Sequence, residues 1–389
     1  MKSVQIGAAW FPDAVGFPEV SGLNRYFHGF VSGLAASGDE VLAAAYDVSR
    51  FLVTERLVVR SLGNKADGLV QRFRTQRAAV LACLSTEPDL AAFHYVPSTI
   101  GSLHALGKVP LICHFHGPLS AERRFEGQNR VMTYLMALME RAAFCRARHF
   151  IVLSHAFAKT LVSAFSIHPQ RVSVVPGGVD ATRFQIRASR REARTVLGLP
   201  GDGRLIVTVR QLLHRKGLSN LIDAAAGIVS AHPEVSFALI GSGPLEPVLR
   251  QQIAKMGLEG NVTLVGPVTD DALALWYRAA DFTILPTVAL EGFGLSAIES
   301  LAAGTPALGA PVNGLVEALE PLSRALVLSG SSPAELGHGI VQALRGERIL
   351  PDAETCARYA ADNFDWAVVV ARVRGIYARV LEDARSSPR

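Results

Sequence analysis

Short apolar runs alternate with longer stretches of helical periodicity along the whole chain. Each run is four to six residues long and rich in valine, isoleucine, leucine and alanine, as expected of strands buried on both faces. The twelve strands that this pattern predicts are Val4–Ala8, Val41–Ala45, Leu90–His94, Leu111–His114, His149–Leu153, Val172–Val175, Leu205–Val209, Val235–Ile240, Val262–Val265, Phe282–Leu285, Thr305–Gly309 and Ala325–Leu328.

The stretches between these runs place apolar residues three and four positions apart, which predicts amphipathic helices. The clearest are Leu23–Ser37, Gln71–Leu84, Arg130–Arg146, Leu218–His232 and Pro244–Met256. Regular alternation of strand and helix predicts parallel sheets covered by helices on both faces. Twelve strands are too many for one such sheet, so the predicted fold class is α/β with two Rossmann-like, doubly wound domains. Ligands of such sheets bind outside the carboxyl ends of the strands.

The length of 389 residues also favours two domains. A polar, arginine-rich stretch near Phe184–Arg194 divides the chain into an N-terminal domain, 1–186, and a C-terminal domain, 187–365. We expect residues 366–389 to form an amphipathic helix that packs back on the N-terminal domain. The apolar face of this helix is formed by Val369, Val373, Ile376, Tyr377 and Val380.

The composition is that of a globular protein, with 49% hydrophobic and 19% charged residues. The four cysteines lie far apart, which excludes a disulfide framework or a zinc ribbon and fits a reducing compartment. The chain opens without a signal-peptide pattern and contains no apolar run of about 18 residues. We therefore expect a cytoplasmic protein, peripheral to the inner face of the membrane at most.

Positive charge is concentrated in the first half of the chain. Residues 1–186 contain 19 lysines and arginines against 13 acidic residues, and residues 187–389 contain 20 against 21. The basic half favours an anionic partner, but no block of like charges points to nucleic acid. The arginine-rich, hydrophobic run Arg123–Arg148 is compatible with contact to a membrane surface and equally with a core helix.

The segment from Leu285 to Leu301 carries the most informative pattern, in which a strand ends, a glycine-containing loop follows and a helix begins near Gly294. Its glutamates Glu291 and Glu299 can face the same ligand at the carboxyl edge of a sheet. A helix N-terminus at this place offers unpaired amide groups to a phosphate. Two isolated glutamates could also be ordinary surface charges.

A second pattern follows the strand Leu205–Val209, where Arg210 and Lys216 lie in one loop. The planar fork of an arginine and the point charge of a lysine suit a diphosphate. Read alone, the loop could equally be a basic segment in solvent. The Gly-Ser-Gly of residues 241–243 and the histidine His116 also follow strands, but each is weak evidence by itself.

The order of these segments resembles that of the retaining glycosyltransferases of the GT-B fold called glycosyltransferase family 4. The resemblance covers nearly the whole chain, and its second half is the more diagnostic. The matching segments are S-G-L-N-R-Y at 21–26, H-F-H-G-P at 114–118, V-V-P-G-G-V-D at 174–180, V-R-Q-L-L-H-R-K-G at 209–217, I-G-S-G-P at 240–244, E-G-F-G-L-S-A-I-E at 291–299, N-G-L-V-E at 313–317 and F-D-W at 364–366.

The resemblance implies two Rossmann-like domains that face each other across a cleft, and it implies roles for the motif residues. Arg210 and Lys216 match the pair that grips the donor's diphosphate. Glu291 matches a glutamate that contacts the transferred sugar, and Glu299 matches one that holds the nucleotide ribose. His116 matches a histidine that faces the donor sugar and the acceptor.

Further positions are implied to contact the donor. Phe293, Gly294 and Leu295 match a loop that meets the sugar and the phosphates, and Val268 matches a segment that cradles the base. Gly22 matches part of the N-terminal glycine loop. The chain departs from the family pattern at Ser21-Gly22 and Asn313-Gly314, since Gly-Gly is usual at both places.

The implied activity is transfer of a sugar, with retention, from a UDP- or GDP-linked donor to a hydroxyl of a glycan or lipid-linked saccharide, in polysaccharide or glycoconjugate biosynthesis. No Asp-x-Asp motif occurs, so we expect neither a metal nor another cofactor. A nucleotide-sugar 2-epimerase and a non-catalytic sugar-binding protein remain alternatives. A nicotinamide dehydrogenase is disfavoured because no G-x-G-x-x-G follows the first strand.

Overall fold

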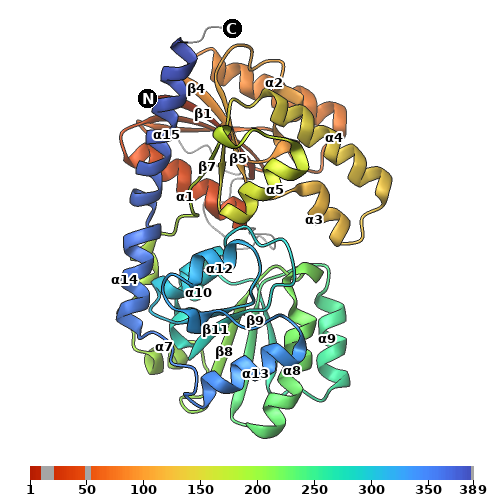
Figure 1. Ribbon diagram of the computed structural model, residues 1–389, viewed down its shortest axis with the longest axis vertical. Helices are drawn as coiled ribbons and strands as arrows, with labels where there is room; N and C mark the ends of the chain where they lie inside the picture. Colours follow the sequence, from red (N-terminus) through yellow and green to blue (C-terminus); the bar gives the residue numbers. More distant parts are fainter. Residues whose placement is uncertain (10–21, 49–53, 387–389) are drawn as a thin grey trace. The chain divides into compact units, whose positions relative to one another are not determined.

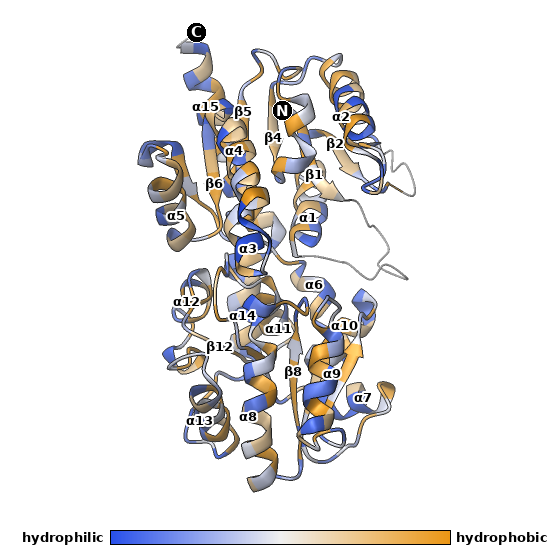
Figure 2. Cartoon of the chain, turned by 90° about the vertical axis from the view of Figure 1, so that its right-hand side faces the viewer, coloured by the Kyte–Doolittle hydropathy of each residue, from blue (hydrophilic) through white to orange (hydrophobic). Residues whose placement is uncertain are grey.

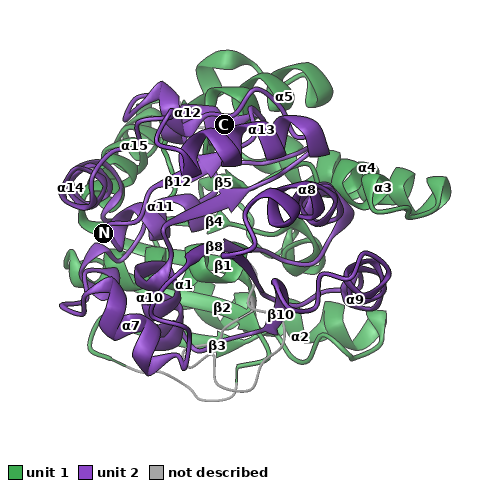
Figure 3. Cartoon of the chain, turned by 90° about the horizontal axis from the view of Figure 1, so that it is seen from below, with its two compact units in different colours: residues 1–13, 20–178, 366–389 green, residues 14–19, 179–365 purple. Residues whose placement is uncertain are grey.

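The computed structural model describes residues 1–9, 22–48 and 54–386, and these residues form two compact units. The first unit contains residues 1–9, 22–48, 54–178 and 366–386, and the second contains residues 179–365 (Figure 3). The sequence predicts a division after residue 186. Residues from 179 onward belong to the second unit, where Val179 forms an isolated bridge with Asp365 and donates a hydrogen bond to the carbonyl of Phe364.

The first unit is built on a parallel sheet with the strand order β3-β2-β1-β4-β5-β6-β7. Its strands are β1 (Lys2–Ala9), β2 (Glu40–Tyr46), β3 (Leu57–Ser61), β4 (Leu90–Phe93), β5 (Leu111–Phe115), β6 (His149–Val152) and β7 (Val172–Val174). Most described residues of the central strands β1, β4 and β5 are buried, which explains why these strands read as continuous apolar runs.

Helices cover both faces of this sheet (Figure 1). The connections from β1 to β2 and from β2 to β3 run toward one edge of the sheet, and those from β3 onward run toward the other edge. Right-handed crossovers therefore place α1 on one face and α2, α4 and α5 on the other. The helices of this unit are α1 (Gly22–Ala36), α2 (Leu69–Leu84), α3 (Leu119–Phe125), α4 (Arg130–Arg146), α5 (His155–Phe165) and α15 (Trp366–Ser386), with 3₁₀ turns η1 (Val96–Ser98), η2 (Ile100–Ser102) and η3 (Pro169–Arg171).

The C-terminal helix α15 packs on α1. The helices approach closely at Gly29, where a β-carbon would lie 2.3 Å from the indole of Trp366. Deeper in the unit, the Tyr377 hydroxyl lies 2.7 Å from Nε2 of His114 on β5. The apolar stripe that predicted this helix, from Val369 to Val380, is buried.

The second unit contains a smaller parallel sheet with the order β10-β9-β8-β11-β12. Helices α8 and α9 follow β8 and β9 on one face, and α10 and α11 return on the other. The strands are β8 (Arg204–Val209), β9 (Val235–Ile240), β10 (Val262–Gly266), β11 (Phe282–Leu285) and β12 (Ala307–Gly309). The helices are α6 (Ala181–Phe184), α7 (Arg190–Val196), α8 (Leu218–Ala231), α9 (Glu246–Lys255), α10 (Asp270–Ala279), α11 (Leu295–Ala302), α12 (Gly314–Leu319), α13 (Pro333–Leu344) and α14 (Ala353–Phe364), with 3₁₀ turns η4 (His214–Lys216) and η5 (Arg324–Leu326).

One strand prediction was wrong, and one strand was missed. The segment Ala325–Leu328 forms most of the 3₁₀ turn η5 and a single bridge from Val327 to Gly309. It is not a strand because the Ser323 side chain accepts a hydrogen bond from the amide of Ala325 and caps the 3₁₀ turn. The strand β3 was missed because Arg60 and Ser61 interrupt its apolar pattern at the edge of the sheet.

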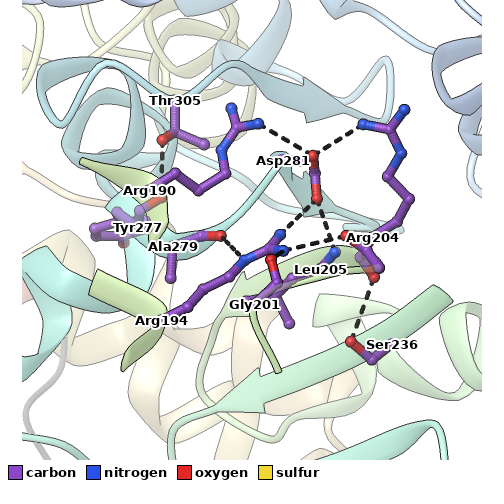
Figure 4. A network of polar contacts seen from close by, with 11 residues as sticks. Arg190, Arg194, Gly201, Arg204, Leu205, Ser236, Tyr277, Ala279, Asp281 and Thr305 are labelled. Atoms are coloured by element: carbon purple, nitrogen blue, oxygen red, sulfur yellow. Dashed lines mark hydrogen bonds and ion pairs between the residues drawn. The ribbon is translucent and has the colours of Figure 1, made fainter. Parts of the chain in front are cut away.

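The arginine-rich stretch before β8 is part of the second unit and not a linker. Ser189 and Glu192 form a capping box that starts α7. From this helix Arg194 reaches Asp281 at the amino ends of β8 and β11, with a distance of 2.9 Å between Nη2 and Oδ2 (Figure 4). This ion pair is joined by Arg190 and Arg204 and ties α7 to the sheet.

Candidate functional site

The carboxyl edge of the five-stranded sheet brings two of the predicted segments together. Strand β8 ends at Val209, directly before Arg210, and the turn η4 places Lys216 a few residues later. The neighbouring strand β11 ends at Leu285 and leads into the loop that carries Glu291. Because β8 and β11 are paired in parallel, their following loops lie side by side.

These loops form a buried polar cluster, called the Glu291 cluster here, of Arg210, Lys216, Thr287 and Glu291. Oε2 of Glu291 accepts hydrogen bonds from Nη1 of Arg210 and Nζ of Lys216, each at 2.9 Å. Nη2 of Arg210 donates to Oγ1 of Thr287 at 3.0 Å, and that hydroxyl lies 3.2 Å from the same Oε2. All four side chains are buried, so these charges interact with little screening by water.

Burial and charge act against each other in this cluster. Burial alone would raise the pKa of Glu291, but the cations of Lys216 and Arg210 outweigh it and hold this pKa well below its ordinary range. Burial lowers the pKa of Lys216 to about 8, against the opposing attraction of Glu291. At neutral pH the cluster therefore contains two cations and one carboxylate.

Arg215 supports the cluster and was missed by the sequence analysis. Its carbonyl accepts hydrogen bonds from the amides of Val288 and Ala289, and its Nη1 donates to the carbonyl of Leu290 at 3.2 Å. Leu290 has a φ of 55°, a left-handed conformation that a leucine rarely adopts. Arg215 thus holds the strained loop from which Glu291 projects, and its position next to Lys216 in the same motif was the available signal.

The Gly-Ser-Gly segment after β9 packs against the loop of Arg210. A β-carbon on Gly241 would lie 1.9 Å from the carbonyl oxygen of Arg210, so only glycine fits. The Arg210 and Leu212 amides donate to the carbonyls of Ile240 and Ser242. The glycine motif therefore contributes to the site by shaping the backbone that carries Arg210.

The second glutamate, Glu299, lies on α11, the helix that follows the loop of Glu291. Its Oε2 accepts a hydrogen bond from the hydroxyl of Tyr277 at 2.8 Å. Tyr277 is fully buried on α10 and was not predicted; its only sequence signal is its place among the buried positions of that helix. This tyrosine fixes the rotamer of a glutamate that is itself almost completely buried.

The start of α11 lies between the two glutamates. Gly294 is its N-cap with a φ of 86°, and Leu295 is its first residue. Phe293 is buried against the ring of Phe364, with 5.3 Å between the centroids. The first amide groups of a helix lack partners within the helix, so they can meet an anion. Val268 follows β10 at the same carboxyl edge, two strands away from β8.

His116 and Gly22 belong to the first unit. Gly22 is the first residue of α1, whereas the neighbouring Ser21 lies outside the described residues. His116 follows β5, where its Nε2 lies 3.3 Å from Nδ1 of His94 and its ring packs edge-on against Tyr26. Burial lowers the pKa of His116 to about 3, so its imidazole is neutral at physiological pH.

The described residues contain no group of three or more histidine, cysteine or acidic side chains placed to hold a metal ion. Within the same residues, no helix combines the length and the apolar content that crossing a bilayer requires.

Known proteins share this architecture. The chain matches sucrose-phosphate synthase from Thermosynechococcus elongatus with a TM-score of 0.80 and 20% identity, over 98% of this chain and 100% of that one. It also matches Alr3699/HepE from Anabaena, solved in complex with UDP-glucose, with a TM-score of 0.76 and 19% identity, over 97% and 100%. Two parallel α/β units with these neighbours define the GT-B fold.

Sequence comparison narrows the class to a family. Residues 20–183 match the family model described as Glycosyltransferase Family 4, and residues 189–363 match the model described as Glycosyl transferases group 1. The chain belongs to glycosyltransferase family 4.

Its curated relatives include two proteins named D-inositol 3-phosphate glycosyltransferase. The one from Catenulispora acidiphila, named with the number 2, is 32% identical over 298 residues, which is 74% of this chain and 66% of that protein. The one from Acidothermus cellulolyticus is 35% identical over 239 residues, 59% and 53% of the two chains. The chain thus matches between about half and two thirds of these relatives' length.

Proposed function

We propose that this protein is a retaining glycosyltransferase that moves a sugar from a UDP- or GDP-linked donor to a hydroxyl of a glycan or lipid-linked saccharide. The observation that carries the proposal is the Glu291 cluster, in which two buried cations face one carboxylate. Such a cluster is short of one negative charge, and a diphosphate would supply it. The names of the relatives and the UDP-glucose bound by Alr3699/HepE support a nucleotide-sugar donor.

The cations suit the charge that develops during transfer. As the bond between the anomeric carbon and the diphosphate breaks, the leaving oxygen gains negative charge, which Arg210, Lys216 and the start of α11 would stabilise. One cation about 4 Å from one anion contributes about 4 kcal/mol at an effective dielectric constant near 20. Two fixed cations can therefore assist departure without a metal ion.

Glu291 is assigned a positioning role. Its Oε2 is already engaged by both cations and by Thr287, and its pKa lies well below the ordinary range, which makes it a weak nucleophile and a weak base. We therefore assign retention to attack by the acceptor hydroxyl on the face that the diphosphate leaves. The acceptor proton passes to an oxygen of the departing phosphate, so the step is balanced without a protein base.

The other predicted residues are assigned to donor and acceptor binding. Glu299, fixed by Tyr277, would hold the ribose, and Phe293, Gly294 and Leu295 would meet the sugar and phosphates. Val268 would pack against the nucleotide base of the donor. His116, neutral at physiological pH, would hydrogen-bond the sugar or the acceptor, and Gly22 would approach an acceptor or phosphate closely.

Release of nucleoside diphosphate tests the activity. The full chain is incubated with UDP-, GDP- and ADP-linked sugars in EDTA, with and without a panel of saccharide acceptors, and anomeric configuration is read by NMR. We expect acceptor-dependent release with one donor, a retained configuration, and no dependence on a divalent ion. A thermal-shift screen selects the donor, since a ligand at 100 times its Kd adds about 2.7 kcal/mol to stability.

The control and the competing functions give different results in the same assay. Lys216→Ala should bind the acceptor normally and release little diphosphate. A donor consumed with no acceptor present would indicate a nucleotide-sugar epimerase, and binding without any release would indicate a sugar-binding protein. Transfer that is lost in EDTA and restored by Mn²⁺ would contradict metal independence.

We propose a cytoplasmic location, because the four cysteines are free and a reducing compartment would keep them so. A lipid-linked acceptor would bring the protein to the inner face of the membrane as a peripheral protein.

A further inference from the structure

Exposed hydrophobic side chains gather on the two helices α3 and α4 of the first unit. Of the fourteen large hydrophobic residues that are exposed in the described chain, six fall between positions 125 and 138. They are Phe125, Val131, Met132, Tyr134, Leu135 and Leu138. Monomeric proteins rarely leave apolar side chains so concentrated in one place unless the surface meets a partner.

The outer side of α4 is apolar by its helical spacing. Val131, Leu135 and Leu138 recur at intervals of four and three residues, so they share one face of the helix. The opposite face carries Thr133 and Phe144, which are buried against the unit. Val131 at the start of the stripe is 71% exposed, and Leu135 and Leu138 further along are 48% and 45% exposed, so folding of the chain does not cover this face.

Arginines border this apolar stripe. Arg123 and Arg124 end α3, and Arg130 and Arg141 flank the stripe on α4; all four are exposed. The one acidic residue of α4, Glu140, faces inward, where it accepts a hydrogen bond from the amide of Leu119 at 2.7 Å. The outward face of α4 is therefore both hydrophobic and positively charged. Figure 2 shows hydrophobic residues along α4 and hydrophilic ones on α3.

Helix α2 repeats this character on the same face of the sheet. Leu69 and Val70 are exposed at its start, Arg74 and Arg77 are exposed further along, and the helix contains no acidic residue. Two separate helices on one face of the unit thus combine exposed apolar residues with arginine.

We propose that the α3–α4 surface, Arg123 to Arg141, binds the anionic phospholipid surface of a membrane. The apolar side chains would enter the boundary between headgroups and acyl chains, and the arginines would extend to the lipid phosphates. A two-fold dimer through this surface is disfavoured, since its four exposed arginines outnumber the half-buried Glu122 and Glu126 and would face those of the other copy. Charge complementarity selects an anionic membrane and not a second copy of the chain.

A lipid-linked acceptor of the proposed function would lie in such a membrane, so in this respect the proposal rests on the proposed function. Membrane binding is tested without donor or acceptor, so its failure and the failure of glycosyl transfer are separate results.

Vesicle flotation of the full chain tests the proposal. The vesicles contain phosphatidylcholine alone or mixed with phosphatidylglycerol, and three variants are compared with the original chain. The stripe variant replaces the apolar residues of α4 (Val131→Ser, Leu135→Gln, Leu138→Gln). The charge variant replaces two arginines of α3 (Arg123→Gln, Arg124→Gln). The third is a matched control that removes three exposed hydrophobic residues of the second unit (Val196→Ser, Val248→Gln, Ile349→Gln).

The original chain and the control should float with the mixed vesicles, at least tenfold more tightly than with phosphatidylcholine. The stripe variant should lose at least tenfold in binding. The charge variant should lose about 25-fold on mixed vesicles, since each arginine near an anionic surface contributes about fivefold. All substituted side chains are exposed, so we expect unchanged circular dichroism and melting.

Three results would overturn the proposal. The first is absence of the original chain from the floated fraction, and the second is flotation of the stripe and charge variants equal to that of the control. The third is sedimentation of the original chain as a dimer and of the stripe variant as a monomer, which would assign this surface to a second copy.

Discussion

The second unit contains two groups of cations around a single carboxylate, at opposite edges of the same five-stranded sheet. At the amino edge, Asp281 uses both oxygens: Oδ1 accepts from Arg190 and Arg204, and Oδ2 from Arg194 and the amide of Leu205 (Figure 4). Arg194 also donates to the carbonyls of Ala279, Gly201 and Gly203. The carboxylate and its buried arginine are therefore saturated with partners.

At the carboxyl edge, the Glu291 cluster is incomplete. Two buried cations share Oε2 of Glu291, and within the described part of the chain Nε of Arg210 has no hydrogen-bond partner. Such a buried donor costs about 1–3 kcal/mol, but Arg60 and Arg348 also have a buried Nε without a partner among the described residues, so this atom alone does not distinguish the cluster.

Both groups have more cations than carboxylates, but Arg190 and Arg204 are about half exposed, so water solvates them, whereas both cations of the Glu291 cluster are buried. The comparison teaches that solvent meets the surplus charge of the Asp281 group, and we propose that a ligand meets that of the Glu291 cluster.

The largest effect is expected from removing Asp281. Asp281→Ala leaves Arg194, whose side chain is 5% exposed, without its carboxylate, and breaking such a buried pair costs about 3–5 kcal/mol of unfolding free energy. Urea denaturation measures the loss. Turnover per folded molecule should stay near that of the original chain; a stable Asp281→Ala variant with impaired turnover would reverse the roles given to the two groups.

Removing a cation of the Glu291 cluster should affect turnover most. We expect Arg210→Ala and Lys216→Ala to lower kcat about 100-fold or more, in the range found when one preorganised charge stabiliser is removed. Steady-state kinetics with the identified donor measures this. Arg204→Ala is the matched control, because Arg204 also binds a carboxylate but is 51% exposed. Its kcat should stay close to that of the original chain. Near-normal kinetics in both cluster variants would contradict the leaving-group role.

The pKa of Lys216, about 8, predicts opposite pH dependences for activity and stability. Above pH 8 the cation is lost, so kcat/KM at low donor concentration should fall about tenfold per pH unit. Between pH 8 and the ordinary value of 10.5, the unfolded chain binds this proton more tightly than the folded one, so Lys216 makes stability rise with pH. Lys216→Arg should remove both the fall of kcat/KM and the rise of stability with pH. If either pH dependence persists in that variant, it belongs to another group.

The sequence predicted most strands of the two sheets and the loops whose residues form the Glu291 cluster, because both follow from strong local patterns; the roles of these residues stay a prediction. Buried parallel strands produce apolar runs, and the loop residues Arg210, Lys216 and Glu291 each follow such a run. The supporting residues escaped prediction. Tyr277 and Thr287 read as ordinary buried positions, and only packing reveals that their hydroxyl groups bind Glu299 and Glu291. The edge strand β3 was missed for a similar reason, since its pairing comes from β2 and not from its own pattern.

The smallest effect is expected from Thr287, whose Oγ1 joins Arg210 to Glu291. Thr287→Val keeps the shape of this fully buried side chain and removes the hydroxyl, so Nη2 of Arg210 loses a partner. One such hydrogen bond contributes about 1 kcal/mol, which predicts a fall of about fivefold in kcat with little change in donor KM. Thr287→Ser should restore the rate.

Thr208 provides a matched control for this substitution on strand β8. It is equally buried, and its Oγ1 has no hydrogen-bond partner among the residues that the structure describes. Thr208→Val should therefore leave kcat unchanged and stability unchanged or slightly higher. Equal rates for the two valine variants would mean that the hydroxyl of Thr287 does not orient Arg210, and the Glu291 cluster would then depend on its charges alone.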